Sequence, residues 1–359
     1  MVNKFNSYSN FVFPAIRGIQ AGKEYYVVMC PLKLIPEIFK FNEDSLRPEL
    51  RAQRTLNKSR VPEMANYMLN EDYLFSSLTA SVDGDVKFLP VDKDNQRIGT
   101  LTIAFTANFL INDGQHRRAA IQKALEVKPE LAHETISVVF FLDKGLNKSQ
   151  QMFSDLNKYA VKPTKSLSIL YDHRHEFSQI TVESLIHVPI FKHYTDKERT
   201  SISNRSPKVF TLNNIYHANC ELLGKTKKKP TINEGDKELI IEFWQEVYSN
   251  MVEWNAVVNK QMSAFELRKK YVHAQGLLLV AIGLLGNQII KDKENWKIIL
   301  KKFSLINWKR TNKEWNGRAI INGKISKSST NMLLTLNYIK NKMGLSLTSK
   351  ENEIENKIR

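Results

Sequence analysis

The segment 111–121 reads INDGQHRRAAI and stands where a strand pattern gives way to a helix pattern. Residues 109–111 are strand-like, whereas 115–127 have the spacing of a helix. Between them, Asp113 is of the type that caps a helix through its side chain. Gly114 permits a tight turn or the close approach of a ligand. Because the first N–H groups of a helix lack partners within it, this junction is a natural site for an anion.

His116, Arg117 and Arg118 stand at the wrong end of this helix for cations, since the helix dipole is positive there. The conflict costs roughly 0.3–1 kcal/mol for each charge, and broken local rules tend to indicate function. A bound anion removes the conflict by meeting backbone donors and guanidinium groups together. In the alternative, Asp113 forms an ion pair with Arg117 and the helix is only structural. Both interpretations stay open.

A second basic stretch, RAQRTLNKSR, occupies residues 51–60 and contains four cations and no acid. Cations of this kind contact DNA phosphates, while Gln53 and Asn57 have the groups that read polar base edges. A solvated surface stretch is the alternative. The residues assigned here to DNA or phosphate binding are Arg51, Arg54, Asn57, Lys58 and Arg60.

The composition favours a folded protein with an anionic partner. The chain has 359 residues, with 53 Lys and Arg against 37 Asp and Glu, a net charge of +16. This surplus suits nucleic acid or a membrane surface, and the length suggests two domains. The most apolar run, 276–286, is too short to cross a bilayer. Two cysteines provide no disulfide framework, so the expected compartment is the cytoplasm.

The pattern of elements changes near residue 160, from mixed α/β to mostly helical. The pair Asp83-Gly84 predicts a hairpin, and strand, helix and strand across 101–142 predict a βαβ unit. The expected fold is α+β followed by α, with an α/β domain at 1–162, a helical domain at 163–345 and a frayed polar tail at 346–359. The predicted strands are 24–30, 77–82, 86–89, 101–105, 109–111 and 135–142. The predicted helices are 61–70, 115–127, 165–187, 264–290, 332–342 and one that Asp236 caps, with an apolar and aromatic stripe from Leu239 to Trp254 interpreted as core.

Other motifs carry less information. Gly224-Lys225-Thr226 imitates the end of a P-loop, but the full pattern needs glycine where Asn219 stands. The loop 224–230, GKTKKKP, is either a phosphate contact or a solvated loop. His173 and His175 are two residues apart and point to different sides of a helix, so no metal site is predicted. The two cysteines, Cys30 and Cys220, are expected to be small buried residues.

The string DGQHRRAAI resembles the defining motif of the DGQHR-domain proteins. Three flanking segments fit as well: FVFPAIRGIQAG at 11–22, RAQRTLNKSRVPEMANYM at 51–68 and FSDLNKYAVKPTKS at 153–166. Together they resemble the DndB family of DNA sulfur-modification (phosphorothioation) proteins over most of the first 190 residues. The resemblance implies a DNA-binding regulator that acts on the promoter of the sulfur-modification gene cluster, not the sulfur-transfer chemistry itself.

The same segment is similar in pattern to the GERR-type box of ParB partition proteins and to the G-x-H-R box of sulfiredoxins. In those folds it binds a phosphate-bearing ligand at a helix start, so the resemblance implies a ParB/sulfiredoxin-like α/β domain. Gln115 takes the place of the reactive cysteine of sulfiredoxins, which argues against their chemistry. Gln115 and His116 also replace Glu and Arg of ParB, which leaves nucleotide binding open.

The leading hypothesis is a promoter-binding repressor of the cytoplasm and nucleoid. Its expected partners are double-stranded DNA, other proteins of the sulfur-modification system and a second copy of the chain, but no membrane. The alternative is an enzyme that binds ATP or another nucleotide, with Asp113 or His116 assisting hydrolysis; the lack of a P-loop counts against it. A third hypothesis is a protein scaffold. The predicted anion site consists of Gly114, Gln115, His116, Arg117 and Arg118, with Asp113 fixing its geometry.

Overall fold

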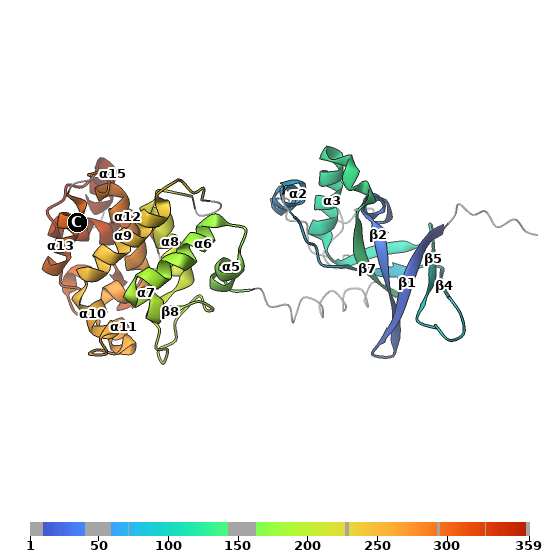
Figure 1. Cartoon of the computed structure of the whole chain (residues 1–359), viewed down its shortest axis with the longest axis horizontal. Helices are drawn as coiled ribbons and strands as arrows, with labels where there is room; N and C mark the ends of the chain where they lie inside the picture. Colours follow the sequence, from blue (N-terminus) through green and yellow to red (C-terminus); the bar gives the residue numbers. More distant parts are fainter. Residues whose placement is uncertain are drawn as a thin grey trace, which may run out of the picture. The chain divides into compact units, whose positions relative to one another are not determined.

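The computed structural model describes residues 10–39, 59–70, 72–142, 163–226, 230–292, 295–326 and 328–356. The chain divides into two compact units, residues 1–161 and 162–359. Unit 1 is built around a sheet and unit 2 is built from packed helices (Figure 1). Among the described residues, no helix combines the length and the apolar character needed to cross a membrane.

Unit 1 contains a mixed seven-stranded sheet in the order β4-β5-β1-β2-β7-β3-β6. Neighbouring strands are antiparallel except β3 and β7, which run parallel. Alternate residues face the core, as expected of a half-buried sheet; on β7 these are Ile136, Val138 and Phe140. The strands are β1 Asn10–Gln20, β2 Lys23–Pro31, β3 Leu78–Asp83, β4 Val86–Pro90, β5 Ile98–Ala104, β6 Asn108–Asp113 and β7 Thr135–Leu142.

The predicted hairpin at Asp83-Gly84 is wrong, although both of its strands exist. β3 pairs with β6 and β7, whereas β4 pairs with β5, so the hairpin turn lies at 91–97 instead. A Cβ atom on Gly84 would lie only 2.6 Å from the Cβ of Ala107. The glycine therefore permits close contact between two bends of the sheet and does not form a hairpin turn.

The predicted βαβ unit is also wrong. Helix α3 (Gln115–Val127) does connect β6 to β7, at the positions that the sequence predicted. However, β3 lies between these strands and is antiparallel to β6 but parallel to β7. The two strands are therefore antiparallel to each other. The parallel pair in this sheet is β3 and β7, which are far apart in sequence.

Two helices of unit 1 share its core with the sheet. α2 (Arg60–Asn70) packs against α3, and the buried residues of both helices belong to the same hydrophobic cluster as the strands. α3 buries Ala120, Ile121 and Ala124, while α2 buries Ala65 and Met68. Shorter elements are η1 (Leu32–Leu34), α1 (Ile35–Ile38) and η3 (Pro129–His133).

Unit 2 surrounds a large aromatic core. Phe243, Trp244 and Trp254 are fully buried, which confirms that the predicted stripe is core. Its main helices are α5 Lys165–Tyr171, α6 Glu176–Ser184, α7 Pro189–Tyr194, α8 Leu212–Leu222, α9 Asp236–Ser249, α10 Val252–Val258, α11 Ala264–Lys270, α12 Gly276–Ile289, α13 Trp296–Lys301, α14 Ser329–Lys342 and α15 Ser349–Asn356. Its short elements are η4 Leu185–His187, η5 Val272–Ala274, η6 Lys302–Leu305, η7 Lys313–Trp315, β8 Thr195–Asp196, β9 Phe210–Thr211, β10 Ile320–Ile321 and β11 Lys324–Ile325.

Two long helices predicted in this unit are each interrupted. The segment 165–187 breaks between α5 and α6, where Asp172 Oδ1 accepts a hydrogen bond from the backbone N–H of His175 (3.2 Å). Such a local bond competes with the helical pattern. The segment 264–290 breaks between α11 and α12, at the short helix η5.

Two further predictions for this unit are wrong: the cap at the start of α9 and the frayed end of the chain. Gly235, in a left-handed conformation, precedes α9, and Asp236 does not cap the helix. Its carboxylate instead accepts bonds from the Asn233 N–H and from Lys225. The polar end of the chain, predicted to fray, contains α15, which buries Glu351 and Glu355 against α14.

Candidate functional site

A cavity of about 310 Å³ lies at the start of α3 in unit 1. Three parts of the chain line it: the first turns of α2, the segment 74–76 and the DGQHR segment. Two helices therefore begin beside one cavity. The lining residues are Arg60, Met64, Leu74, Phe75, Ser76, Asp113, Gly114, Gln115, His116 and Arg117.

Gly114, and not Asp113, is the N-cap of α3. It has a φ of 108°, in the left-handed region that favours glycine. A Cβ atom there would lie 2.3 Å from Leu78 Cδ2 and 3.1 Å from Arg117 Nη2. Asp113 is the last residue of β6 and makes no capping hydrogen bond. The predicted capping role of Asp113 is therefore wrong, because glycine makes the turn and the carboxylate has another partner.

That partner is Arg117. Its Nη2 donates to Asp113 Oδ2 at 2.5 Å, and its Nη1 donates to the hydroxyl of Ser76. This is the local ion pair that the sequence offered as the structural alternative. The guanidinium group thus ties the start of α3 to the segment before β3. Its Nε is buried without a hydrogen-bond partner among the described residues.

Arg118 does not line the cavity, which corrects its predicted place in the anion site. Its side chain is buried, and burial lowers the pKa of the guanidinium group. Nε donates to the carbonyl of Phe39 at 2.9 Å, Nη2 to that of Pro36 at 3.3 Å and Nη1 to Gln122 Oε1 at 2.5 Å. The side chain therefore fastens α3 to the chain around α1.

Gln115 has the most informative environment in the cavity. The residue is only 6% exposed, and its Nε2 has no hydrogen-bond partner within the described parts of the chain. Leaving a buried amide without a partner costs about 1–3 kcal/mol, so such a group calls for an explanation. A ligand that accepts hydrogen bonds would supply the missing partner.

His116 and Arg60 complete the polar side of the cavity. Burial, and then the nearby charge of Arg60, lower the pKa of the His116 imidazole. The ring is therefore neutral at pH 7, since its ordinary pKa is already below that value. Arg60 is exposed at the first residue of α2 and supplies a positive charge.

The segment 72–77 forms the remaining wall and carries no sequence motif. The backbone N–H of Leu74 donates to the hydroxyl of Tyr67 at 2.9 Å. Tyr73 and Phe75 pack against Tyr67 and against each other, and the Tyr73 hydroxyl donates to Glu134. These contacts fix the wall against α2. Sequence reasoning missed Met64, Leu74, Phe75 and Ser76, because nothing in this segment signals that it lies beside the motif.

Four residues of the predicted DNA-binding stretch lie outside the described residues: Arg51, Arg54, Asn57 and Lys58. Arg60, the fifth, lies at the cavity. In the loop 224–230, Lys225 forms an ion pair with Asp236, and the three lysines at 227–229 are not described.

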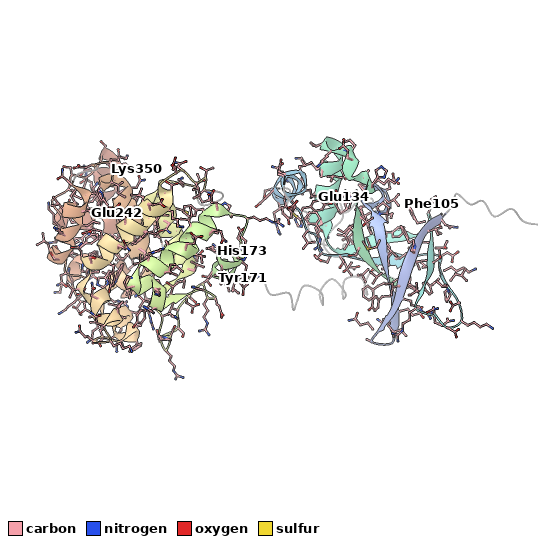
Figure 2. The ribbon with its side chains drawn as sticks, viewed as in Figure 1. Phe105, Glu134, Tyr171, His173, Glu242 and Lys350 are labelled. Atoms are coloured by element: carbon pink, nitrogen blue, oxygen red, sulfur yellow. The ribbon has the colours of Figure 1, made fainter. Side chains whose placement is uncertain are left out.

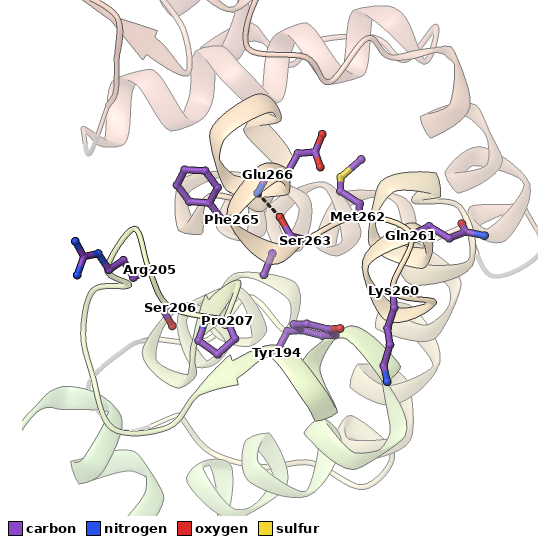
Figure 3. A pocket seen from close by; sticks show the side chains of 11 residues that line it. Tyr194, Arg205, Ser206, Pro207, Lys260, Gln261, Met262, Ser263, Phe265 and Glu266 are labelled. Carbon is purple, nitrogen blue, oxygen red and sulfur yellow. Dashed lines mark hydrogen bonds between the residues drawn. The ribbon is translucent and has the colours of Figure 1, made fainter.

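Unit 2 has a larger cavity of about 500 Å³, shown in Figure 3. Two of its polar groups have partners within the protein: the Tyr194 hydroxyl donates to the Val257 carbonyl, and Ser263 Oγ accepts from the Glu266 N–H. In Figure 3 the charged ends of Arg205 and Lys260 point away from its centre. The cavity in unit 1 is therefore the stronger candidate.

The cysteines and the histidine pair considered in the sequence analysis lie outside the lining of this cavity. Cys30 and Cys220 are fully buried, as predicted, and burial raises the pKa of the Cys30 thiol to about 12. His173 lies at the break between α5 and α6, on the surface of unit 2 (Figure 2). Across the described ranges, no cluster of His, Cys, Asp and Glu is suited to hold a metal ion.

Comparison with known families gives this cavity its context. A family model described as DNA-sulfur modification-associated matches residues 13–346, nearly the whole chain. The chain belongs to that family, DndB. The match confirms the resemblance seen in the first 190 residues and extends it through most of unit 2. No curated protein and no solved structure matched the chain.

Proposed function

We propose that this protein is a repressor that binds the promoter of a DNA phosphorothioate-modification gene cluster, with a backbone phosphate of duplex DNA in the cavity of unit 1. The observation that carries the proposal is the buried Gln115 amide, which has no partner among the described residues. Gln115 lines the cavity at the start of α3, and the start of α2 lines the same cavity. Membership of a family associated with DNA sulfur modification supports the choice of DNA as the anion.

The contact follows from the geometry of the cavity lining. Phosphate oxygens accept hydrogen bonds from Gln115 Nε2 and from the first N–H groups of α3, which have no acceptors within the helix. Arg60 provides the compensating charge from the start of α2. Arg117 stays paired with Asp113 and holds the wall through Ser76. The basic residues of 51–58, which lie outside the described residues, are proposed from the sequence to bind further phosphates.

In this proposal the two units have different tasks. Unit 1 acts as the ParB/sulfiredoxin-like domain that the DGQHR motif implies, with a phosphate-bearing ligand at a helix start. Unit 2 supplies contacts to a second copy of the chain or to other proteins of the modification system. The net charge of +16 attracts DNA from a distance. The site of action is the nucleoid.

The test is a titration of the full chain into fluorescent duplexes, one with the promoter of its own gene cluster and one with a scrambled sequence. Binding is followed by anisotropy at several salt concentrations. We expect tighter binding of the promoter, and affinities that fall steeply with salt as phosphate contacts release counterions. Equal affinity for both duplexes at physiological salt would contradict the repressor proposal.

A pair of arginine variants tests the cavity itself. Arg60→Ala is expected to weaken binding of both duplexes by about fivefold and to reduce the salt slope by about 0.9, the value for one lost phosphate contact. Arg97→Ala is the matched control, because Arg97 is an exposed arginine of unit 1 outside the cavity lining. Equal losses in the two variants would mean that only net charge matters.

A further inference from the structure

The cavity lining is chemically mixed. Its polar side chains are those of Arg60, Ser76, Gln115 and His116 and the paired Arg117 and Asp113. Its apolar side chains, called the apolar side below, are those of Met64, Leu74 and Phe75. An ordinary phosphate linkage presents two equivalent non-bridging oxygens, and both seek hydrogen bonds. The apolar side would leave one of them without a donor, which is costly for a polar group removed from water.

Leu74 is the clearest part of this mismatch. Its side chain is 82% exposed, the most exposed large hydrophobic residue that the structure describes. A single exposed leucine needs no explanation on most surfaces. Here, however, its backbone N–H is fixed by the Tyr67 hydroxyl, and its neighbours Tyr73 and Phe75 pack in an aromatic cluster. The chain thus holds an apolar side chain at the rim of the cavity that contains the Gln115 amide.

We propose that the cavity prefers a phosphorothioate linkage over an ordinary phosphate linkage in DNA, with the sulfur against Met64, Leu74 and Phe75. This inference rests on the proposed function, in which a backbone linkage of DNA occupies the cavity. It goes further by naming the chemical form of that linkage. The repressor would then bind the modified product more tightly than unmodified DNA of the same sequence.

The chemistry of sulfur fits the divided lining. In a phosphorothioate, sulfur replaces one non-bridging oxygen, and the linkage keeps its single negative charge. Sulfur is more polarizable and a weaker hydrogen-bond acceptor than the oxygen that it replaces. It therefore loses little by leaving water for the apolar side. The remaining oxygen accepts from Gln115 and the start of α3, while Arg60 balances the charge.

The volume of the cavity is adequate for such a group. At about 310 Å³ it corresponds to roughly ten water molecules in the liquid. The phosphorus of a phosphorothioate linkage is also a stereocentre, so its two non-bridging positions are distinct. With the polar and apolar sides fixed, one diastereomer directs sulfur to the apolar side and the other directs it to Gln115. The preference is therefore expected to be stereospecific.

The experiment compares three duplexes of the promoter sequence with the full chain: unmodified, phosphorothioated throughout one strand as the Rp form, and the same as the Sp form. We expect one diastereomer to bind at least about threefold more tightly than unmodified DNA, and the other not to. Equal affinities, or equal tightening by both diastereomers, would overturn the inference and leave promoter binding intact. Failure of the unmodified promoter to bind better than scrambled DNA would instead overturn the proposed function.

Two leucine variants assign the preference to the cavity wall. Leu74→Ala is expected to abolish the difference between diastereomers, because it removes the most exposed apolar side chain of the lining. Leu89→Ala is the matched control, because Leu89 is 64% exposed on β4 and does not line the cavity. It should keep the difference. A preference that survives in Leu74→Ala would overturn the proposed role of this wall.

Discussion

Buried polar side chains occur in both units, but they are used differently. In unit 2, the ammonium group of Lys340 donates to Glu351 Oε2 at 2.6 Å and to Gln288 Oε1 at 3.0 Å. In unit 1, the buried Gln115 amide faces a cavity and has no hydrogen-bond partner within the described residues. The Lys340 ammonium group has its partners within the protein, whereas the Gln115 amide has none among the described residues.

This difference separates residues that hold the fold from residues that are available to a ligand. Arg118 shows that sequence position does not decide between the two. It is adjacent to Arg117 in the motif, but it bonds to the carbonyls of Phe39 and Pro36 and belongs with the first group. Membership of the motif therefore does not by itself make a residue available to a ligand. The following variants test this distinction.

The largest effect is expected from Lys340→Ala. The change leaves the carboxylate of Glu351, which is 4% exposed, without its cation. Removing one partner of a buried ion pair typically costs about 3–5 kcal/mol. The free energy of unfolding can be followed by tryptophan fluorescence in urea, because all five tryptophans lie in unit 2. The control Lys342→Ala breaks an exposed pair with Glu314 and should cost less than about 1 kcal/mol. Similar losses of unfolding free energy in the two variants would mean that the buried Lys340 pair stabilises unit 2 no more than the exposed Lys342 pair does.

Arg118→Ala should have the next largest effect. We expect about 2–3 kcal/mol less stability in unit 1, since hydrogen bonds from a charged group to buried carbonyls are lost. Hydrogen exchange in peptides from α3 measures the change. Lysine at this position should restore only part of it, because an ammonium group lacks the planar fork of arginine. Unchanged hydrogen exchange together with a large loss of DNA affinity would show that Arg118 binds DNA and does not stabilise the fold.

Gln115→Met tests whether the Gln115 amide, which has no partner among the described residues, serves the fold or a ligand. The variant removes an amide that lacks a partner but keeps a similar volume, so the stability of unit 1 should stay the same or rise by up to about 1 kcal/mol. DNA affinity should nevertheless fall, by about tenfold. The matched control is Gln179→Met in unit 2, because Gln179 Nε2 donates to the Asp172 carbonyl at 2.8 Å. That variant should lose stability and keep DNA affinity. Destabilisation by Gln115→Met would show that its amide serves the fold.

The smallest effect concerns pH. His273 is fully buried, and burial lowers its pKa despite the opposing influence of Glu253. Its Nδ1 accepts from Trp254 Nε1 at 3.1 Å, and Nε2 lies 3.0 Å from Glu253 Oε2. Below the ordinary histidine pKa of about 6.5 the unfolded chain binds the proton more readily, so unit 2 loses stability as pH falls. This contribution is at most about 1.4 kcal/mol per pH unit.

Urea unfolding at pH 7.5 and pH 5.5, followed by tryptophan fluorescence, measures this dependence. His273→Gln should flatten it, whereas His187→Gln, at an exposed histidine of the same unit, should not. An unchanged pH dependence in His273→Gln would mean that other groups cause it.

The strands and helices of unit 1 could be predicted, but their pairing could not. The apolar run TISVVFFL located β7, and the helix pattern gave the ends of α3, because these signals are local. The partners of β3 and β4 are set by contacts between distant parts of the chain. The pair Asp83-Gly84 is typical of a hairpin turn, so the sequence suggested one there. In the structure, Gly84 instead permits a close approach to Ala107 where the sheet bends.

The candidate site was predicted in part for a similar reason. Arginines against a helix dipole are visible in the sequence, and they pointed to the junction of β6 and α3, which lines the cavity. Two of the three partners of Arg118 are backbone carbonyls, which have no sequence signature. The apolar wall at 74–76 was missed because it joins the motif only through folding. Gly114 was recognised as permissive, but a side chain of capping type led to the wrong assignment for Asp113.

The last helix has a practical consequence for anyone who shortens this protein. The family match ends at residue 346, before α15 begins. A chain cut there would lack Glu351 and Glu355, the carboxylates that neutralise Lys340 and Arg318. Trimming by homology alone would thus leave both cations without their carboxylate partners and lower the stability of unit 2.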